Sequence, residues 1–349
     1  MDALMQLNLM IWLAWSEVPP DDPVKPVFRN RGFDLFAIGP KIPISLPKQK
    51  AMKDHLGFHK EAVAPDLLLR HRTNPELLVL ECKETSFDVS SSSSKQATGY
   101  LIISGTEMAN TLGLIPATSL QQYEATACYV VNAEQEGPMF TTLGAIQAEL
   151  RKNGLHANHA NALGIYEEGN LVFLVEATDG CFEKNNQVVI LEGVTSVYPL
   201  IPWDPSLGEN PEARKDLEER LRMVFVSHLG SHLEQALAEP LEISIEELLK
   251  GAIPVWDAWQ DRSTQKSVRR GARRFMFDIL KRLDEKTGLS FESTPAGWQI
   301  TVSHYDEIER IRRVLTSSTV RQLPIPFEEY RKPELWDDFD GGGVTRVNM

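Results

Sequence analysis

The chain has 349 residues, of which 42% are hydrophobic and 24% are charged. These proportions are close to those of globular proteins and exclude a disordered chain, and the length predicts two domains. The formal net charge of −13 means that overall charge gives no sign of a nucleic-acid binder, although residues 261–349 carry 16 Lys and Arg against 14 Asp and Glu.

The first 200 residues alternate between predicted helices and strands. Apolar residues recur at helical spacing over residues 3–17, and Pro19-Pro20 ends that helix. The helix lacks a basic flank and a cleavage site, and it is too short to span a bilayer, so we expect a cytoplasmic protein without membrane attachment. The next predicted elements are a strand at 33–38, a helix at 48–56, apolar runs at 64–70 and 77–83, a helix at 94–104, a strand at 126–132, a helix at 141–153, a hairpin at 163–177 and a strand at 188–191.

A domain boundary is predicted near residue 205, where prolines and a glycine interrupt any regular element. We therefore expect one domain over residues 1–205 and a mainly helical one over 206–349. The second domain contains helices at 212–238, 244–250 and 263–286, followed by a hairpin and a helix within 289–315. Its acidic and then glycine-rich tail, from Pro324, is expected to be loosely ordered.

The number and spacing of the cysteines indicate whether disulfides or structural zinc are expected. There are three, Cys82, Cys128 and Cys181, and they are far apart with no CxxC pair. A disulfide framework or a structural zinc site is therefore not expected, and a reducing compartment fits best.

Two apolar runs around the turn at residues 72–75 predict a β-hairpin that brings charged groups together. If the loop is centred on Thr73 and Asn74, facing residues have numbers that sum to 147, which pairs Asp66 with Glu81. Lys83 lies two residues after Glu81 and shares its face of the strand. Charged groups among apolar neighbours are costly unless they are paired or bind a metal. Two adjacent carboxylates favour a hard cation such as Mg²⁺, which can activate water for phosphodiester hydrolysis.

Pro65-Asp66, followed after fourteen residues by Glu81-Cys82-Lys83, resembles the motif of the PD-(D/E)xK nuclease superfamily. The resemblance implies a restriction-endonuclease-like αβββαβ core. It also implies that Asp66, Glu81 and the carbonyl of Cys82 bind Mg²⁺ or Mn²⁺, and that Lys83 positions the attacking water. The family often adds an acidic residue from its first helix, for which Glu17 and Glu61 are the candidates.

A helix after the motif strengthens the resemblance. Gln96 and Tyr100 are four residues apart and share a helix face. This pattern is similar to the QxxxY helix of the RecB-like branch, which implies that both side chains line the site and contact substrate. Lys95 is a further candidate for a phosphate contact.

A basic stretch in the second domain has two interpretations. One broad face of the predicted helix carries five basic residues, Lys266, Arg269, Arg270, Arg273 and Arg274. The helix either contacts phosphates or pairs with the acidic middle of the chain, residues 111–260, which carry 8 Lys and Arg against 22 Asp and Glu. Trp256 and Trp259 are interpreted as core residues rather than base-stacking platforms, and His228 and His232 as ordinary helix residues rather than metal ligands.

The sequence as a whole predicts an α/β nuclease domain and a mainly helical domain that binds nucleic acid or a partner. The expected activity is Mg²⁺-dependent hydrolysis of DNA in restriction, repair or anti-phage defence. The alternative is a non-cutting subunit that keeps the fold to bind DNA or to scaffold a defence complex. RNA as substrate has no feature that separates it from DNA, and a second copy of the chain is among the expected partners.

Overall fold

The computed structural model describes residues 1–15, 23–115, 121–177, 187–193, 200–201 and 211–316. The expected boundary at residue 205, the candidate acid Glu17, Cys181 and the tail from Pro324 lie outside these described residues. Contacts group the chain into two compact units. The first comprises residues 1–225 and 243–276, and the second comprises residues 226–242 and 277–349.

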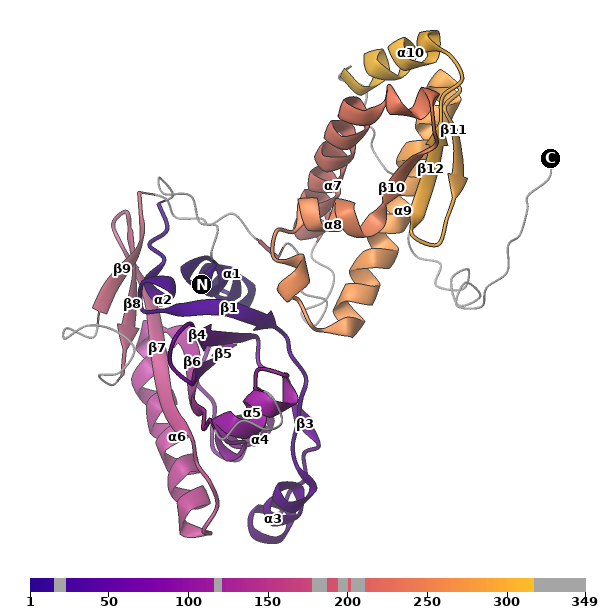
Figure 1. Cartoon of the computed structure of the whole chain (residues 1–349). Coiled ribbons are helices and arrows are strands. Elements are labelled where there is room, and N and C mark those ends of the chain that lie inside the picture. The colour runs from indigo at the N-terminus through magenta and orange to yellow at the C-terminus, as the bar shows by residue number, and fades with distance from the viewer. Residues whose placement is uncertain (16–22, 116–120, 178–186, 194–199, 202–210, 317–349) are drawn as a thin grey trace. The chain divides into compact units, whose positions relative to one another are not determined.

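A curled sheet of seven strands forms the framework of the first unit (Figure 1). Its strands are β1 (Phe33–Ile38), β4 (Leu67–His71), β5 (Glu76–Cys82), β6 (Glu124–Asn132), β7 (His159–Glu168), β8 (Leu171–Glu176) and β9 (Gln187–Glu192), adjacent in that order. The pairs β5–β6 and β6–β7 are parallel, and the other pairs are antiparallel. The sheet is therefore mixed, and the expected α/β class is confirmed.

The hairpin of β4 and β5 has the predicted register. The paired residues are Leu67 with Leu80, Leu68 with Val79, Leu69 with Leu78, and Arg70 with Leu77, and every pair of numbers sums to 147. Leucine and valine fill both strands because both faces of the hairpin are buried. Asp66 directly precedes β4, so continuing this register places it opposite Glu81.

Helices cover the two faces of the sheet. On one face, α4 (Ser92–Ile102), α5 (Gly105–Thr111) and α6 (Ala133–Lys152) share a core with residues of β4, β5 and β6. On the other, α1 (Ala3–Ala14) packs against β1, β4 and β5, and none of its residues belongs to that core. The serine tract starts α4, since the Ser91 side chain accepts a hydrogen bond from the Ser94 amide.

The chain leaves the sheet between β1 and β4. This excursion, residues 41–63, contains β2 (Ile42–Pro43), α3 (Leu46–Leu56) and β3 (Ala62–Val63). The two short strands pair with each other, Ile42 with Val63, and not with the large sheet. The excursion therefore begins and ends beside Asp66.

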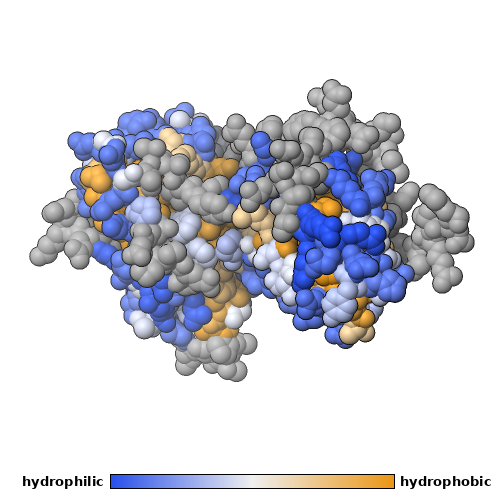
Figure 2. All heavy atoms as spheres, turned by 90° about the horizontal axis from the view of Figure 1, so that it is seen from above, coloured by the Kyte–Doolittle hydropathy of each residue, from blue (hydrophilic) through white to orange (hydrophobic). Residues whose placement is uncertain are grey.

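The remaining described elements are mostly helical. They are α2 (Val27–Asn30) near the N-terminus and, beyond the sheet, α7 (Pro211–His232), η2 (Gln235–Leu237), β10 (Leu241–Ser244), α8 (Ile245–Ala252), η3 (Trp256–Ala258), α9 (Arg262–Thr287), β11 (Ser290–Ser293), β12 (Gly297–Thr301) and α10 (Tyr305–Thr316). The last three strands form a small sheet in the order β10-β12-β11. Polar residues predominate on the surface seen in Figure 2, with apolar residues in smaller patches. Within the described chain, no helix combines the length and the apolar character that crossing a membrane requires.

Candidate active site

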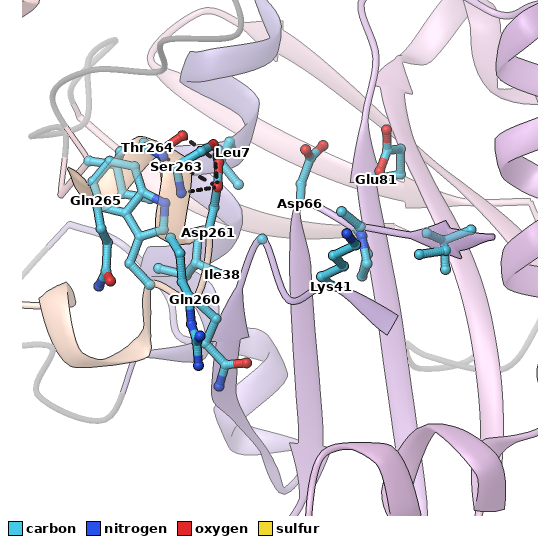
Figure 3. A pocket seen from close by; sticks show the side chains of 18 of the residues that line it. Leu7, Ile38, Lys41, Asp66, Glu81, Gln260, Asp261, Ser263, Thr264 and Gln265 are labelled. Atoms are coloured by element: carbon cyan, nitrogen blue, oxygen red, sulfur yellow. Dashed lines mark hydrogen bonds between the residues drawn. The ribbon is translucent and has the colours of Figure 1, made fainter. Parts of the chain in front are cut away.

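Two carboxylates stand at the same end of the β4–β5 hairpin (Figure 3). The Asp66 Oδ2 atom accepts a hydrogen bond of 2.7 Å from the Cys82 amide, which joins the ends of the two strands. Glu81 is only 2% exposed, whereas Asp66 is half-buried. Both side chains line one cavity. The structure therefore brings together the two acids that the sequence predicted.

Three donors surround the buried Glu81 carboxylate. Its Oε1 atom lies 2.8 Å from Lys83 Nζ and accepts a hydrogen bond of 3.0 Å from Gln96 Nε2. Its Oε2 atom lies 2.8 Å from the Tyr100 hydroxyl. A buried carboxylate is tolerated only when it is paired and hydrogen-bonded, and this network meets that requirement.

Helix α4 supplies two of these donors. Gln96 and Tyr100 lie one turn apart, and Gln96 Nε2 also lies 2.6 Å from the Tyr100 hydroxyl. Gln96 lines the cavity, whereas Tyr100 is fully buried beneath it, with its hydroxyl 2.9 Å from the Ala64 carbonyl. The single hydroxyl proton of Tyr100 is therefore within reach of both Glu81 and the chain before Asp66, and the Tyr100 side chain does not line the cavity.

The titration of the neighbouring groups follows from this arrangement. Burial works to lower the pKa of Lys83, but the adjacent Glu81 carboxylate outweighs it and the pKa is raised. Burial, reinforced by the charges of Asp66 and Glu81, raises the pKa of the Cys82 thiol well above its usual value. Lys83 therefore remains an ammonium ion, and Cys82 is a protonated thiol rather than a nucleophile.

The cavity at the carboxylates has a volume of about 1270 Å³. One wall is formed by the hairpin and the excursion, and a second wall comes from residues 256–269, which are distant in sequence but belong to the same compact unit. The side chains that carry charge in the lining are Lys41, Lys60, Asp66, Glu81, Lys83, Glu246, Asp257, Asp261, Arg262 and Arg269.

The second wall contacts the end of β1 through main-chain atoms. Ile38 forms a parallel bridge with Trp259, and the Gln260 amide donates a hydrogen bond of 2.7 Å to the Ile38 carbonyl. Asp261 then caps α9 by accepting hydrogen bonds from the Ser263 and Thr264 amides at 3.0 and 3.3 Å (Figure 3). Main-chain contacts therefore connect the second wall of the cavity to strand β1.

The predicted basic helix contributes one arginine to this wall. Arg269 Nε donates a hydrogen bond of 2.9 Å to Glu246 Oε1, and its guanidinium lies 5.2 Å from the centre of the Trp256 ring. Arg270, Arg273 and Arg274 do not line the cavity. Arg269 therefore fits the interpretation of an arginine paired with the acidic middle of the chain, and phosphate contacts by the other three remain a prediction.

Several predicted residues lie away from the cavity. Lys95 is exposed on α4, with its ammonium 5.9 Å from the centre of the Phe58 ring, and Glu61 is exposed on the excursion. Trp256 and Trp259 are 1% and 5% exposed and pack edge to face, which confirms that they are core residues. In the described part of the chain, no three side chains of His, Cys, Asp or Glu gather as a metal site. The proposed ligand set needs only two such side chains.

Sequence reasoning missed three residues at this site. Lys41 and Lys60 line the cavity, but both lie in an irregular stretch without a motif. The Tyr129 hydroxyl is buried with no hydrogen-bond partner among the described residues, and the charges of Glu81 and Asp66 act on it. Its pairing with Glu81 across the parallel β5–β6 ladder has no local sequence signal.

Comparison of the chain with protein-family models, with curated proteins and with solved structures finds no match.

Proposed function

We propose that this protein is a Mg²⁺-dependent nuclease that hydrolyses DNA phosphodiester bonds. The observation that carries the proposal is the joint placement of Asp66, Glu81 and Lys83 at one end of a hairpin, inside a cavity. Two acids and an ammonium group are the side chains that metal-assisted phosphodiester hydrolysis requires.

The order of elements supports the same proposal. Helix α1, the antiparallel strands β1, β4 and β5, helix α4 and the parallel strand β6 occur in the order αβββαβ, when the short helices α2 and α5 and the excursion after β1 are counted as insertions. This is the element order implied by the resemblance to PD-(D/E)xK nucleases. We therefore include a restriction-endonuclease-like core in the proposal.

The donor atoms suit a hard divalent cation. Asp66 and Glu81 would hold it together with the main-chain carbonyl of Cys82, and oxygen is the ligand that Mg²⁺ prefers. When bound, the ion would polarise a phosphoryl oxygen and lower the pKa of a coordinated water. Gln96 and Tyr100 fix the Glu81 carboxylate in place, and Lys83, 2.8 Å from Glu81, would orient the attacking water and stabilise developing negative charge.

The test is incubation of the purified protein with supercoiled plasmid and with single-stranded DNA, in Mg²⁺, Mn²⁺ or EDTA. Lys83→Ala and Glu81→Gln are expected to abolish cleavage. Lys53→Ala is the matched control, because Lys53 is exposed on α3 and does not line the cavity. Cleavage that persists in EDTA, or that survives in both site variants, would contradict the proposal.

One observation favours the non-cutting alternative. Helix α1 holds no acidic residue, so the described first helix supplies no third carboxylate, and its cavity-lining residue is Leu7. A protein that binds DNA in the same assay and never cuts it, under every metal condition, would establish this alternative. In either case the proposed setting is restriction, repair or anti-phage defence, with DNA and other proteins of the system as partners.

A further inference from the structure

The excursion presents two lysines to the cavity. Lys41 opens the excursion directly before β2, and Lys60 lies near its end, two residues before β3. Neither forms a hydrogen bond or an ion pair of 4.0 Å or less with another described residue. Two other cations of the cavity lining are engaged, since Lys83 pairs with Glu81 and Arg269 with Glu246.

The hydrocarbon stem of Lys60 lies close to helix α4. A Cβ atom added to Gly99 on α4 would lie 3.8 Å from Lys60 Cδ, so the stem of Lys60 passes over the helix that carries Gln96. The side chain is half-buried, and burial lowers its pKa while the charge of Glu81 opposes that effect. The Lys60 ammonium group is therefore partly desolvated and has no ion-paired carboxylate among the described residues, so an anion from outside the chain would stabilise it. Lys41 is exposed and adds positive charge to the same cavity.

We propose that Lys41 and Lys60 bind backbone phosphates of the nucleic-acid strand whose scissile bond lies at Asp66 and Glu81. This inference rests on the proposed function and adds a phosphate-binding site that lies outside the nuclease motif. A chain of phosphates suits this cavity, because its lining holds both lysines as well as the two carboxylates that would bind the metal.

Phosphate contacts have a signature that separates them from other roles of a lysine. Each contact releases counterions, so the logarithm of the binding constant falls with the logarithm of salt concentration, by about 0.7 per neutralised phosphate of a single strand. Removing a lysine that contacts phosphate therefore reduces this slope. Removing a lysine that only supports the fold leaves the slope unchanged.

The experiment measures binding of a fluorescently labelled single-stranded DNA by anisotropy, in EDTA, across a salt series. We expect Lys60→Ala and Lys41→Ala each to reduce the slope by about 0.7 and to weaken binding most at low salt. Lys60→Arg should keep the slope of the wild type. Lys53→Ala, on α3 of the same excursion, is the matched control and should also keep it. Thermal melts of all variants test whether they are folded.

The outcomes distinguish this inference from the proposed function. If the wild type binds and cuts DNA but Lys60→Ala and Lys41→Ala have the slope of Lys53→Ala, the inference is overturned and the nuclease proposal stands. If the wild type neither binds nor cuts any nucleic acid tested, both fail. A reduced slope in a folded Lys60→Ala variant, with the Lys53→Ala slope unchanged, supports the inference.

Discussion

Glu81 is the residue on which the candidate site depends most. Its carboxylate is almost completely buried, and it meets an ammonium group, an amide and a phenol within 3.0 Å. The sequence predicted the charged residues around this carboxylate, because a carboxylate in an apolar strand is costly unless it is paired or binds a metal. It could not predict Tyr129, because an aromatic residue in a strand gives no sign of whether its hydroxyl will find a partner.

The two tyrosines beneath the site should respond differently to the loss of a hydroxyl. Tyr100→Phe removes a donor to buried Glu81 and is expected to cost about 1–3 kcal/mol of stability. Tyr129→Phe removes a hydroxyl that has no protein partner in the described chain, so it should leave the free energy of unfolding unchanged or raise it by about 1 kcal/mol. Denaturant unfolding of the two variants measures both effects. Equal destabilisation by the two substitutions would contradict this account.

At the scale of elements, the N-terminal cap of helix α5 makes the stability of the fold depend on pH. Glu107 completes the capping box of α5 with Ser104. Burial works to raise the pKa of Glu107, but hydrogen bonds from Lys48 and Ser104 outweigh it and lower that pKa. A lowered pKa in the folded state means that the stabilisation is present above the ordinary value near 4.5 and is lost as pH falls through the lower, folded value.

We therefore expect Glu107→Gln to lower the melting temperature at neutral pH. We also expect it to flatten the fall in stability between about pH 5 and pH 3, since the amide cannot titrate. Melting temperatures of wild type and variant across that range test the prediction. Two parallel curves over the whole range would show that Glu107 does not contribute to the acid dependence.

Close packing of α4 against β3 depends on Gly99. A Cβ atom there would be too close to Val63 Cγ1, a buried side chain with little freedom to move. Gly99→Ala is expected to cost about 1–3 kcal/mol through overpacking and to reduce cleavage, because α4 carries Gln96 and Tyr100. The control is Gly144→Ala on α6, where a Cβ meets nothing within 4 Å and should stabilise the helix by about 0.5–1 kcal/mol. A Gly99→Ala variant as stable as Gly144→Ala would refute the close-packing argument.

Elements with strong local patterns were predicted well from the sequence. The strand at residues 33–38 matches β1 at both ends, and the hairpin register was correct because the turn, centred on Thr73 and Asn74, sets which residues face each other. The helix expected at 141–153 instead begins at Ala133. Gly137 and Pro138 lie inside α6, and Met139, which follows them, is buried in the core. Strands β2 and β3 are too short to produce a periodic pattern.

At the scale of the whole molecule, the way in which distant segments combine into compact units is the feature that local sequence patterns predict least. The first compact unit is discontinuous, since residues 243–276 belong with residues 1–225. One contact that joins them, Ile38 with Trp259, links residues far apart in the sequence and has no motif. Composition and proline content could suggest a boundary near residue 205, but they could not reveal that a later segment returns to complete the cavity.

This discontinuity predicts the behaviour of a shortened chain. A protein that ends at residue 205 lacks Trp256 and Trp259, so Ile38 and its neighbours lose their apolar cover. We expect it to melt at a lower temperature than the full chain and to bind a hydrophobic dye. Calorimetry and dye fluorescence measure this. A cooperative transition at the full-length temperature would show that the later segment is dispensable.

The returning segment also sets an order of events during synthesis. At roughly 5–20 residues per second, Trp259 leaves the ribosome on the order of ten seconds or more after Glu81. During that interval the hairpin can form, because its partners are local, but the second wall of the cavity does not yet exist. A nascent chain can therefore hold the two carboxylates of the hairpin before it has the cavity around them, and the site is completed only after the returning segment has been synthesised.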